Sequence, residues 1–596
     1  MKVFDWLDGR TGYRKILHEA LYENVPGGAR WRYVWGSTLT FTLAIQFITG
    51  IFLWMAYSPS SQTAWESVYY IQHEMTGGWL LRGIHHFTAQ AMNILLVLHL
   101  MQVIIDGAYK APREINFWFG VLLLLLVLGL SLTGYLLPWD QKGYWATRVA
   151  TNIMAITPLI GPAMQKIVIG GADYGHHTLT RFFALHAGVL PGLIIVLLVG
   201  HIYLFRRHGL TAKEPKRRPD APFWPDQVLK DAVACLAVLA VVMFFVLKGG
   251  AELGAPADPS EPFAAARPEW YFLFLFQLLE YFKGQYGFID APIMGALILP
   301  GLVMLILILM PIIGKWRLGH RFNLGFTCAL LFGAAILTVI AVRHDAKDAD
   351  YNASLRIAHR DAERVKVLAR AQGIPPAGAT TLLREDIYSQ GPRIFARNCA
   401  KCHVYDGHDG LGLALTNSSA PDLKGFASRE WIAGLLDPAK VSSSNYFGGT
   451  KFADGKMAKW VKKSVPKASP DQMRQVIAAV SAEANLKSQR EIDARDASLI
   501  ASGRDLIVGD DINCTECHQF RKADEEASAP DLTGYGSRQW MIDFISNPAH
   551  TRFYGKRNDR MPAFGPDKML DTKSIEMVTD WLRGEWFEPE KEIAAK

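Results

Sequence analysis

Residues 85–106 read HHFTAQAMNILLVLHLMQVIID, an apolar stretch that carries two histidines, His85 and His99, on one segment. A helix needs about 20 predominantly apolar residues to cross a membrane, and this stretch has that length. Histidines are rare inside membrane helices and are functional candidates wherever they occur there. The stretch therefore predicts a membrane helix with a function for its imidazole groups.

Apolar stretches of this kind occur seven times in the chain. They lie near 33–57, 88–106, 116–137, 182–205, 228–247, 291–314 and 322–342. Seven of them within 342 residues, separated by polar connections, favour membrane helices over buried core helices. The 596 residues are 50% hydrophobic and 20% charged, which excludes a purely soluble enzyme and a disordered chain. The net charge of +7 comes without a basic face interleaved with aromatic residues, so no nucleic-acid partner is expected.

The positively charged residues predict how the seven segments are oriented. The connection 206–218 has six basic residues against one acid, whereas the connection 58–81 has no Lys or Arg. Because Lys and Arg are enriched on the cytoplasmic side, we expect a cytoplasmic N-terminus and place residues 343–596 on the periplasmic side of an inner membrane. Residues 1–30 contain no apolar core, so no cleavable signal peptide is expected, and the first apolar segment would act as the export signal.

The part of the chain after residue 342 reads as soluble protein and contains an internal repeat. The segment 420–431, APDLKGFASREW, returns at 529–540 as APDLTGYGSRQW, and each copy follows a Cys-x-x-Cys-His motif. Two tandem copies of one small domain are the simplest account. We therefore expect a helical linker over 346–385, a first domain over 386–490 and a second domain over 491–596.

The two Cys-x-x-Cys-His motifs fit the covalent attachment of two haem c groups. In such motifs two thiols bond the porphyrin and the adjacent histidine ligates the iron. One motif alone could be a zinc or redox site, but two inside a periplasmic repeat favour haem. The residues concerned are Cys399, Cys402 and His403 in the first domain, and Cys514, Cys517 and His518 in the second.

The sixth ligand of each c haem is expected downstream of its motif, where a methionine thioether raises the iron potential. Met561, in the segment Arg560-Met561-Pro562, resembles the ligand loop of cytochromes c and is expected to serve the second haem. Met457 takes the similar place in the first domain but lacks the following proline. Met473 is the alternative there, although its helix-like surroundings favour a core residue.

Four membrane histidines fall into two pairs. His85 and His99 are 14 residues apart, and His186 and His201 are 15 apart. Fourteen residues of α-helix return to within about 40° of the starting direction and fifteen to within about 60°, so each pair lies on one face, roughly 21 Å apart along the axis. We expect two bis-histidine sites for two non-covalent haem b groups: His85 with His186, and His99 with His201. His86 competes with His85, but it lies about 140° from His99.

Glycines on the neighbouring helices share this spacing. Gly36 and Gly50 are 14 residues apart, as are Gly120 and Gly134. A flat macrocycle between helices needs room, and only glycine lets the backbone approach that closely, so these four are expected to contact the haems. Ordinary small-residue packing between membrane helices is the alternative.

Four further motifs add a family resemblance. They are VFDW at 3–6, GYLLPWDQ at 134–141, LTRF at 179–182 and PEWY at 268–271. With them, residues 1–342 resemble the cytochrome b of Rieske/cytochrome bc complexes, in the chloroplast-type form whose b subunit and subunit IV are here fused. The resemblance implies a four-helix haem-binding domain over 1–220 and a three-helix domain over 221–345. The fold class expected is all-α, a seven-helix transmembrane bundle followed by two tandem cytochrome c-like helical domains.

The resemblance also implies site residues. In the family the Pro-Glu-Trp-Tyr motif lines the site of quinol oxidation, so Glu269 would accept a quinol proton and Tyr271 would assist. Arg82 and Arg181 are suited to haem propionates, because charge-assisted pairing offsets their burial, although either could be an interface anchor. Arg206 resembles a residue of the inner quinone site, or it belongs to the basic loop.

The function expected is that of a quinol:cytochrome c oxidoreductase coupled to proton translocation. The resemblance implies a separate Rieske iron–sulfur protein, membrane quinol, a soluble cytochrome c or another periplasmic acceptor, and a homodimer in the lipid bilayer. Val34 stands where the chloroplast-type family has a cysteine for an extra haem, so no further covalent haem is expected. Two alternatives stay open: the membrane anchor of a dehydrogenase that works without a Rieske protein, and a non-catalytic haem-bearing sensor or scaffold.

Overall fold

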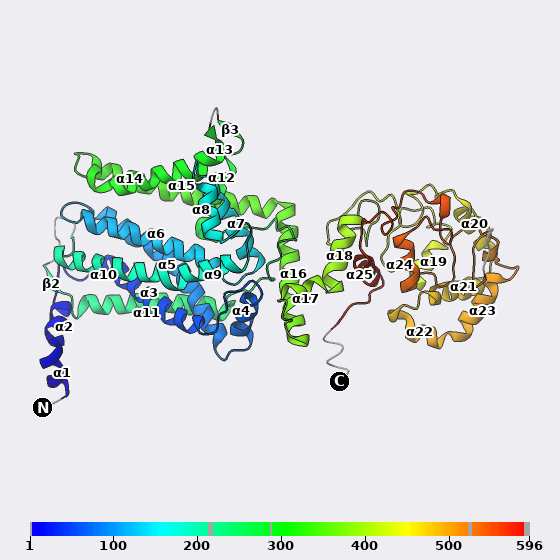
Figure 1. Cartoon of the computed structure of the whole chain (residues 1–596), viewed down its shortest axis with the longest axis horizontal. Helices are drawn as coiled ribbons and strands as arrows, with labels where there is room; N and C mark the ends of the chain where they lie inside the picture. The colour runs from blue at the N-terminus through cyan, green and yellow to red at the C-terminus, as the bar shows by residue number, and fades with distance from the viewer. Residues whose placement is uncertain (1–2, 212–218, 287–288, 523–526, 589–596) are drawn as a thin grey trace. The chain divides into compact units, whose positions relative to one another are not determined.

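The chain is almost entirely helical in the computed structural model, which confirms the all-α class. The structure describes residues 3–211, 219–286, 289–522 and 527–588. These form two compact units, the first comprising residues 1–362 with 374–380 and the second residues 363–373 with 381–596. Figure 1 shows both along the chain.

The first unit contains the apolar helices and their connections. Its helices are α1 (Val3–Thr11), α2 (Tyr13–Leu21), α3 (Val34–Trp54), α4 (Ala64–His73), α5 (Gly78–Ile105), α6 (Glu114–Leu136), α7 (Gln141–Ala155), α8 (Gly161–Ile169), α9 (His176–Ala184), α10 (Leu190–His208), α11 (Asp226–Lys248), α12 (Leu273–Glu280), α13 (Ala291–Ile293), α14 (Leu299–Ile313) and α15 (Gly319–Lys347). Helix α16 (Ala349–Gln372) continues from this unit into the second. Two short antiparallel pairs join β1 (Asn24–Val25) to β2 (Ala221–Pro222) and β3 (Gln285–Tyr286) to β4 (Ile289–Asp290).

Seven helices in the described part of the chain are long and apolar enough to cross a membrane, as the sequence predicts. They are Trp31–Trp54, Gly78–Ile105, Glu114–Leu136, His176–His208, Asp226–Lys248, Ala291–Ile313 and Gly319–Lys347. Large apolar side chains point outward along them: Val199, Leu247 and Phe332 are 64%, 67% and 69% exposed. Helices that are apolar all round suit a lipid environment.

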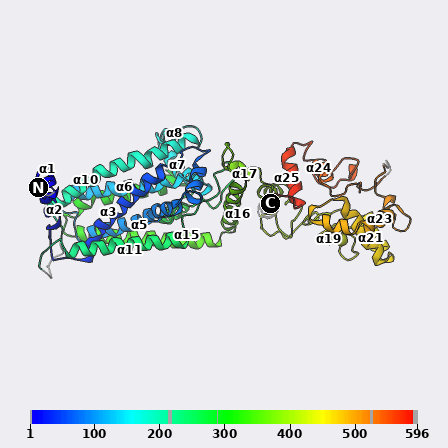
Figure 2. The ribbon, with the colours of Figure 1, turned by 90° about the horizontal axis from the view of Figure 1, so that it is seen from below.

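Helices α3, α5, α6 and α10 form a four-helix bundle, with α3 packed on α5 and α6 on α10. Figures 1 and 2 show these helices running side by side, with α11 alongside α3 and α5. Each helix contributes one buried side chain to a central apolar layer, formed by Leu43, Met92, Val127 and Ile194. This layer lies in the sequence between the two histidine positions of each pair, so it separates two levels of the bundle.

The second unit contains shorter helices separated by long loops. They are α17 (Thr380–Arg384), α18 (Ile387–Asn398), α19 (Arg429–Leu435), α20 (Lys456–Ser464), α21 (Pro470–Glu483), α22 (Arg490–Arg495), α23 (Ala497–Val508), α24 (Arg538–Ser546) and α25 (Thr572–Leu582). Helix α18 packs against α25, and α21 packs against α23. The expected boundary between residues 490 and 491 therefore falls inside a shared packing arrangement.

Candidate functional site

The first membrane histidine pair faces across the bundle at one end. The ring centres of His85 on α5 and His186 are 6.3 Å apart. A metal atom bonded at about 2.0 Å to one nitrogen of each ring would separate the ring centres by roughly 6 Å. Nδ1 of His85 lies 2.9 Å from the hydroxyl of Thr49, and Nδ1 of His186 lies 3.1 Å from the carbonyl oxygen of Leu130. Such partners fix a ring so that its other nitrogen is free for a metal.

A π-helical turn over Leu185–Val189 (η2) explains why the second histidine pair has the longer spacing. The N–H of Leu190 bonds to the carbonyl of Leu185, five residues earlier, where an α-helix would reach back four. The turn absorbs about one residue, so the 15 residues from His186 to His201 advance about as far as 14 residues of α-helix. The two histidines therefore share a face as closely as His85 and His99 do. Such turns are frequent at functional sites.

The second histidine pair occupies the other level of the bundle. Nδ1 of His201 on α10 lies 3.0 Å from the carbonyl oxygen of Asn116, which can only accept, so this nitrogen carries the proton and Nε2 is free. His99 on α5 lies within electrostatic range of His201. The buried Nδ1 of His99 has no hydrogen-bond partner among the described residues.

The four glycines singled out in the sequence each lie against one of these histidines. A Cβ added at Gly36, Gly50, Gly120 or Gly134 would come within 3.8, 3.4, 3.5 or 2.6 Å of the Cε1 atom of His99, His85, His201 and His186 respectively. Each glycine thus keeps space open beside one imidazole. This cradle, together with two facing pairs of neutral donors, fits two haem b groups.

The Pro-Glu-Trp-Tyr motif lies at the same end of the bundle as His85 and His186. Trp270 Nε1 donates to Oε1 of Gln90 (3.1 Å), which lies on α5 five residues beyond His85. Lys142 Nζ lies 3.4 Å from Oε1 of Glu269, whose side chain is only 15% exposed. Burial raises the pKa of Tyr271, which keeps its phenol protonated. A shielded carboxylate, a neighbouring ammonium group and a neutral phenol are therefore grouped at this end.

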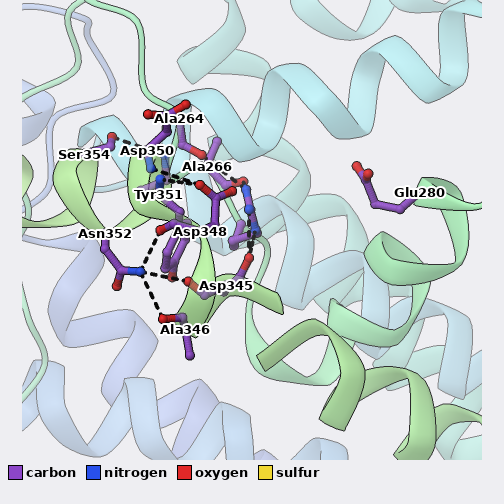
Figure 3. Close-up of polar contacts among 12 residues, drawn as sticks. Ala264, Ala266, Glu280, Asp345, Ala346, Asp348, Asp350, Tyr351, Asn352 and Ser354 are labelled. Carbon is purple, nitrogen blue, oxygen red and sulfur yellow. Dashed lines mark hydrogen bonds and ion pairs between the residues drawn. The ribbon is translucent and has the colours of Figure 1, made fainter. Parts of the chain in front are cut away.

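The segment just before this motif is anchored to the junction between α15 and α16 (Figure 3). Nε and Nη2 of Arg267 both donate to Oδ1 of Asp345, at 2.9 and 2.8 Å. The N–H of Ala265 donates to the hydroxyl of Ser354 (3.2 Å), and Asn352 Nδ2 donates to the carbonyl of Asp345 (3.0 Å). These bonds hold the chain leading into the motif at a fixed place on the bundle.

Two of the three arginines expected at the sites hold backbone. Arg82 donates to the carbonyl oxygens of Ala251 (2.8 Å) and Glu252 (2.6 Å), so it pins the segment after α11 to α5. Arg206, at the end of α10, pairs with Glu23 at 3.1 Å and donates to a carbonyl in α2. Arg181 is exposed on α9, with its guanidinium beside Gly170. A propionate role for Arg82 and Arg181 and a quinone role for Arg206 stay predictions.

The two Cys-x-x-Cys-His motifs have the same local geometry. Nδ1 of His403 donates to the carbonyl of Pro421 (2.8 Å), and Nδ1 of His518 donates to the carbonyl of Pro530 (2.7 Å). These prolines belong to the two copies of the repeat. Burial lowers the pKa of both histidines, so the rings are neutral, which is the form that ligates a metal. All four cysteines are free thiols available for thioether bonds.

The structure places the two candidate methionines differently from the sequence expectation. Met457 lines a cavity of about 350 Å³ together with Cys514, Cys517 and His518. Met561 packs on a separate apolar cluster that also contacts Cys399. Met473 is buried in the core, as expected for the alternative ligand that it was set against. Each methionine thus lies with the motif of the other repeat.

Sequence reasoning missed several groups that position these sites. Thr49 and the carbonyl of Leu130 orient the first histidine pair, and Lys142 and Gln90 contact the Pro-Glu-Trp-Tyr motif. A threonine in an apolar helix, 36 residues from the histidine it contacts, gives no pattern that the sequence alone could reveal. Lys142 follows the GYLLPWDQ motif directly, which was a usable signal.

Comparison with known proteins agrees with this geometry. Residues 90–258 match the family model described as cytochrome b (N-terminal)/b6/petB, and residues 388–480 match that of cytochrome c. The menaquinol:cytochrome c reductase cytochrome b subunit of Bacillus subtilis is 40% identical over 218 residues, which cover 35% of this chain and 97% of that protein.

Two more relatives extend the match along the chain. Cytochrome b of Rhodobacter capsulatus is 33% identical over 335 residues, covering 50% of this chain and 76% of that protein. Cytochrome b6 of Synechococcus sp. is 38% identical over 210 residues, covering 35% of this chain and 98% of that protein. With its histidine pairs, its seven apolar helices and its cytochrome c domain, the chain belongs to the cytochrome b family.

Proposed function

We propose that this chain is the cytochrome b subunit, fused to a dihaem cytochrome c, of a bc-type quinol:cytochrome c oxidoreductase. The observation that carries the proposal is that one end of the four-helix bundle holds both the facing His85–His186 pair and the loop of Glu269. The relative from Bacillus subtilis, a menaquinol:cytochrome c reductase subunit, supports this reaction class.

Four haem groups would be held by residues already described. His85 with His186, and His99 with His201, would ligate two haem b groups at the two levels of the bundle. Cys399, Cys402 and His403, and Cys514, Cys517 and His518, would hold two haem c groups. When bound, the haem irons supply one-electron transfer, which the side chains of this chain cannot perform. The role of the protein is to orient the ligands and to exclude water.

Glu269 would act as the base for quinol. Oxidation of a quinol to a quinone releases two electrons and two protons, and a carboxylate at the pocket edge can receive a proton and pass it to water. Lys142, 3.4 Å away, stabilises the ionised carboxylate that must be present before the proton arrives. Tyr271 would contribute a hydroxyl to the same pocket. One electron would leave through a separate Rieske iron–sulfur protein to the c haems, and the other through the b haems to a quinone at the opposite face.

The charge distribution supports an orientation for this reaction. With the basic segment 206–218 in the cytoplasm, the His85–His186 end and the second unit would lie on the periplasmic side of the inner membrane. Protons would then be released outside and taken up inside, near Arg206. A soluble cytochrome c or another periplasmic acceptor would receive the electrons, and the complex would be a homodimer.

The experiment that tests the proposal compares two carboxylates of neighbouring segments. Glu269→Gln keeps the side-chain size but cannot accept the proton, so we expect quinol:cytochrome c turnover of the purified complex to fall at least tenfold, within the range of about 10²–10⁴-fold for removal of a general base. All four haems should be retained. The control is Glu280→Gln, on α12, because Glu280 pairs with Lys283 outside this site and lies apart from the anchoring contacts in Figure 3. Unchanged turnover in a fully assembled Glu269→Gln complex would contradict the role of this carboxylate.

A further inference from the structure

The two repeats of the second unit exchange their terminal helices. Helix α18, which leads into the first Cys-x-x-Cys-His motif, packs against α25 at the end of the second repeat. Helix α23, which leads into the second motif, packs against α21 at the end of the first repeat. Both contacts use a glycine in the leading helix: a Cβ at Gly391 would overlap Trp581, and a Cβ at Gly503 would overlap the carbonyl of Gln475.

The apolar cores follow the same exchange. One core combines residues of the first repeat with residues that surround the second motif, and its members include Trp431, Val461, Val476, Ile507 and Leu532. The other core combines Phe395, from the first repeat, with residues of the second repeat, among them Trp540, Phe564, Val578 and Trp581. Each core is thus built from the motif half of one repeat and the methionine half of the other.

The chain crosses between the cores at equivalent positions of the two copies. Ala427 and Gly536 occupy the same place in the repeat and share left-handed backbone, with φ of 63° and 72°. They lie in contact, because a Cβ on Gly536 would overlap that of Ala427. Arg583, which is buried, holds the crossing by donating to the carbonyls of Gly536 (2.6 Å) and Ala484 (3.0 Å).

We propose that the two c haems are ligated across the repeats, so that Met457 serves the haem on Cys514, Cys517 and His518. Met457 and these three residues line one cavity of about 350 Å³, which is walled by apolar side chains such as Leu436 and Val480. A thioether, a neutral imidazole and two thiols in one apolar cavity are the donor set of a His/Met haem c. The inference rests on the c haems proposed above and adds which residues hold each one.

The other haem follows by the same arrangement. Met561 packs on the core that contacts Cys399, so it would serve the haem on Cys399, Cys402 and His403. The two methionine loops also meet each other: Phe452 stacks on Tyr554 with ring centres 5.3 Å apart, and Lys451 donates to the carbonyl of Asn558 (3.2 Å). Neither repeat then completes a haem site by itself.

The test uses full-length chains that keep one c haem, with the haem count checked by mass. In the Cys399→Ala/Cys402→Ala chain the remaining c haem is attached at the second motif. Adding Met457→Ala should abolish the thioether-to-iron charge-transfer band and lower the midpoint potential of that haem, because a thioether raises it. Adding Met561→Ala to the same chain should leave both unchanged.

The mirror set keeps the proposal falsifiable if the first chain does not accumulate. In a Cys514→Ala/Cys517→Ala chain, Met561→Ala should remove the band and Met457→Ala should not. The opposite pattern in either set shows ligation within each repeat and overturns the proposal, as does a band that survives or disappears in both methionine variants. Because the readouts are spectral, they do not depend on quinol oxidation, and a failure here would leave the reaction itself untouched.

Discussion

Gly134→Ala tests most sharply whether the first histidine pair is a built haem site. The new Cβ would lie 2.6 Å from Cε1 of His186 and 3.1 and 3.2 Å from its two nitrogens. Carbon atoms in contact sit at about 3.5–4.0 Å, so the ring must move by roughly 1 Å. Overpacking of this kind costs about 1–3 kcal/mol, which corresponds to a roughly 5- to 150-fold weaker haem site.

Gly36→Ala is the matched control, because its Cβ would meet Cε1 of His99 at an ordinary contact distance of 3.8 Å. Both variants replace a helical glycine by alanine, so the gain in helix propensity is common to both. The assay is the transfer of haem b from the purified complex to excess apomyoglobin, with a redox titration of the haem b that remains. We expect Gly134→Ala to lose one haem b and Gly36→Ala to retain both. Full retention in Gly134→Ala, or equal loss in both variants, would refute the reasoning.

Three further predictions concern haem content and the packing around it. Pyridine haemochrome analysis should give a haem b to haem c ratio near one, since two histidine pairs and two Cys-x-x-Cys-His motifs are present. Thr49→Val should weaken the haem site of His85 by about 10–100-fold, as loss of a second ligand-orienting bond does, whereas Thr42→Val, whose hydroxyl bonds only to backbone, should not; haem b content reports the difference. Gly536→Ala should destabilise the second unit by about 1–3 kcal/mol more than Gly555→Ala, because both have positive φ but only the first meets a neighbour; thermal melting followed at the c-haem absorbance checks this.

The helical periodicity of the sequence was enough to predict the membrane bundle. Seven apolar segments, the 14-residue spacing of His85 and His99, and the matching glycines rest on helix geometry alone, and the structure brings each glycine to a histidine. The 15-residue spacing of His186 and His201 implied a 60° offset that the structure does not have. The π-helical turn removes it, and such a turn leaves no local signature in sequence.

The exchange between the two c repeats could not be predicted in this way. Local motifs fix what surrounds His403 and His518, and there the prediction of two equivalent environments agrees with the bonds to Pro421 and Pro530. Which copy of a helix packs on which motif is a long-range choice between two nearly identical sequences. Tandem repeats offer both pairings, and only the tertiary contacts of α18, α21, α23 and α25 distinguish them.

The central claim is that quinol electrons divide between the b haems and, through an iron–sulfur protein, the c haems. The most direct measurement is rapid mixing of the fully oxidised complex with a membrane quinol, recorded at the b and c absorption bands with and without the iron–sulfur protein. We predict that both bands are reduced in the complete complex, and that removal of the iron–sulfur protein abolishes rapid reduction of the c haems. Reduction of the c haems at an unchanged rate without that protein would contradict the claim.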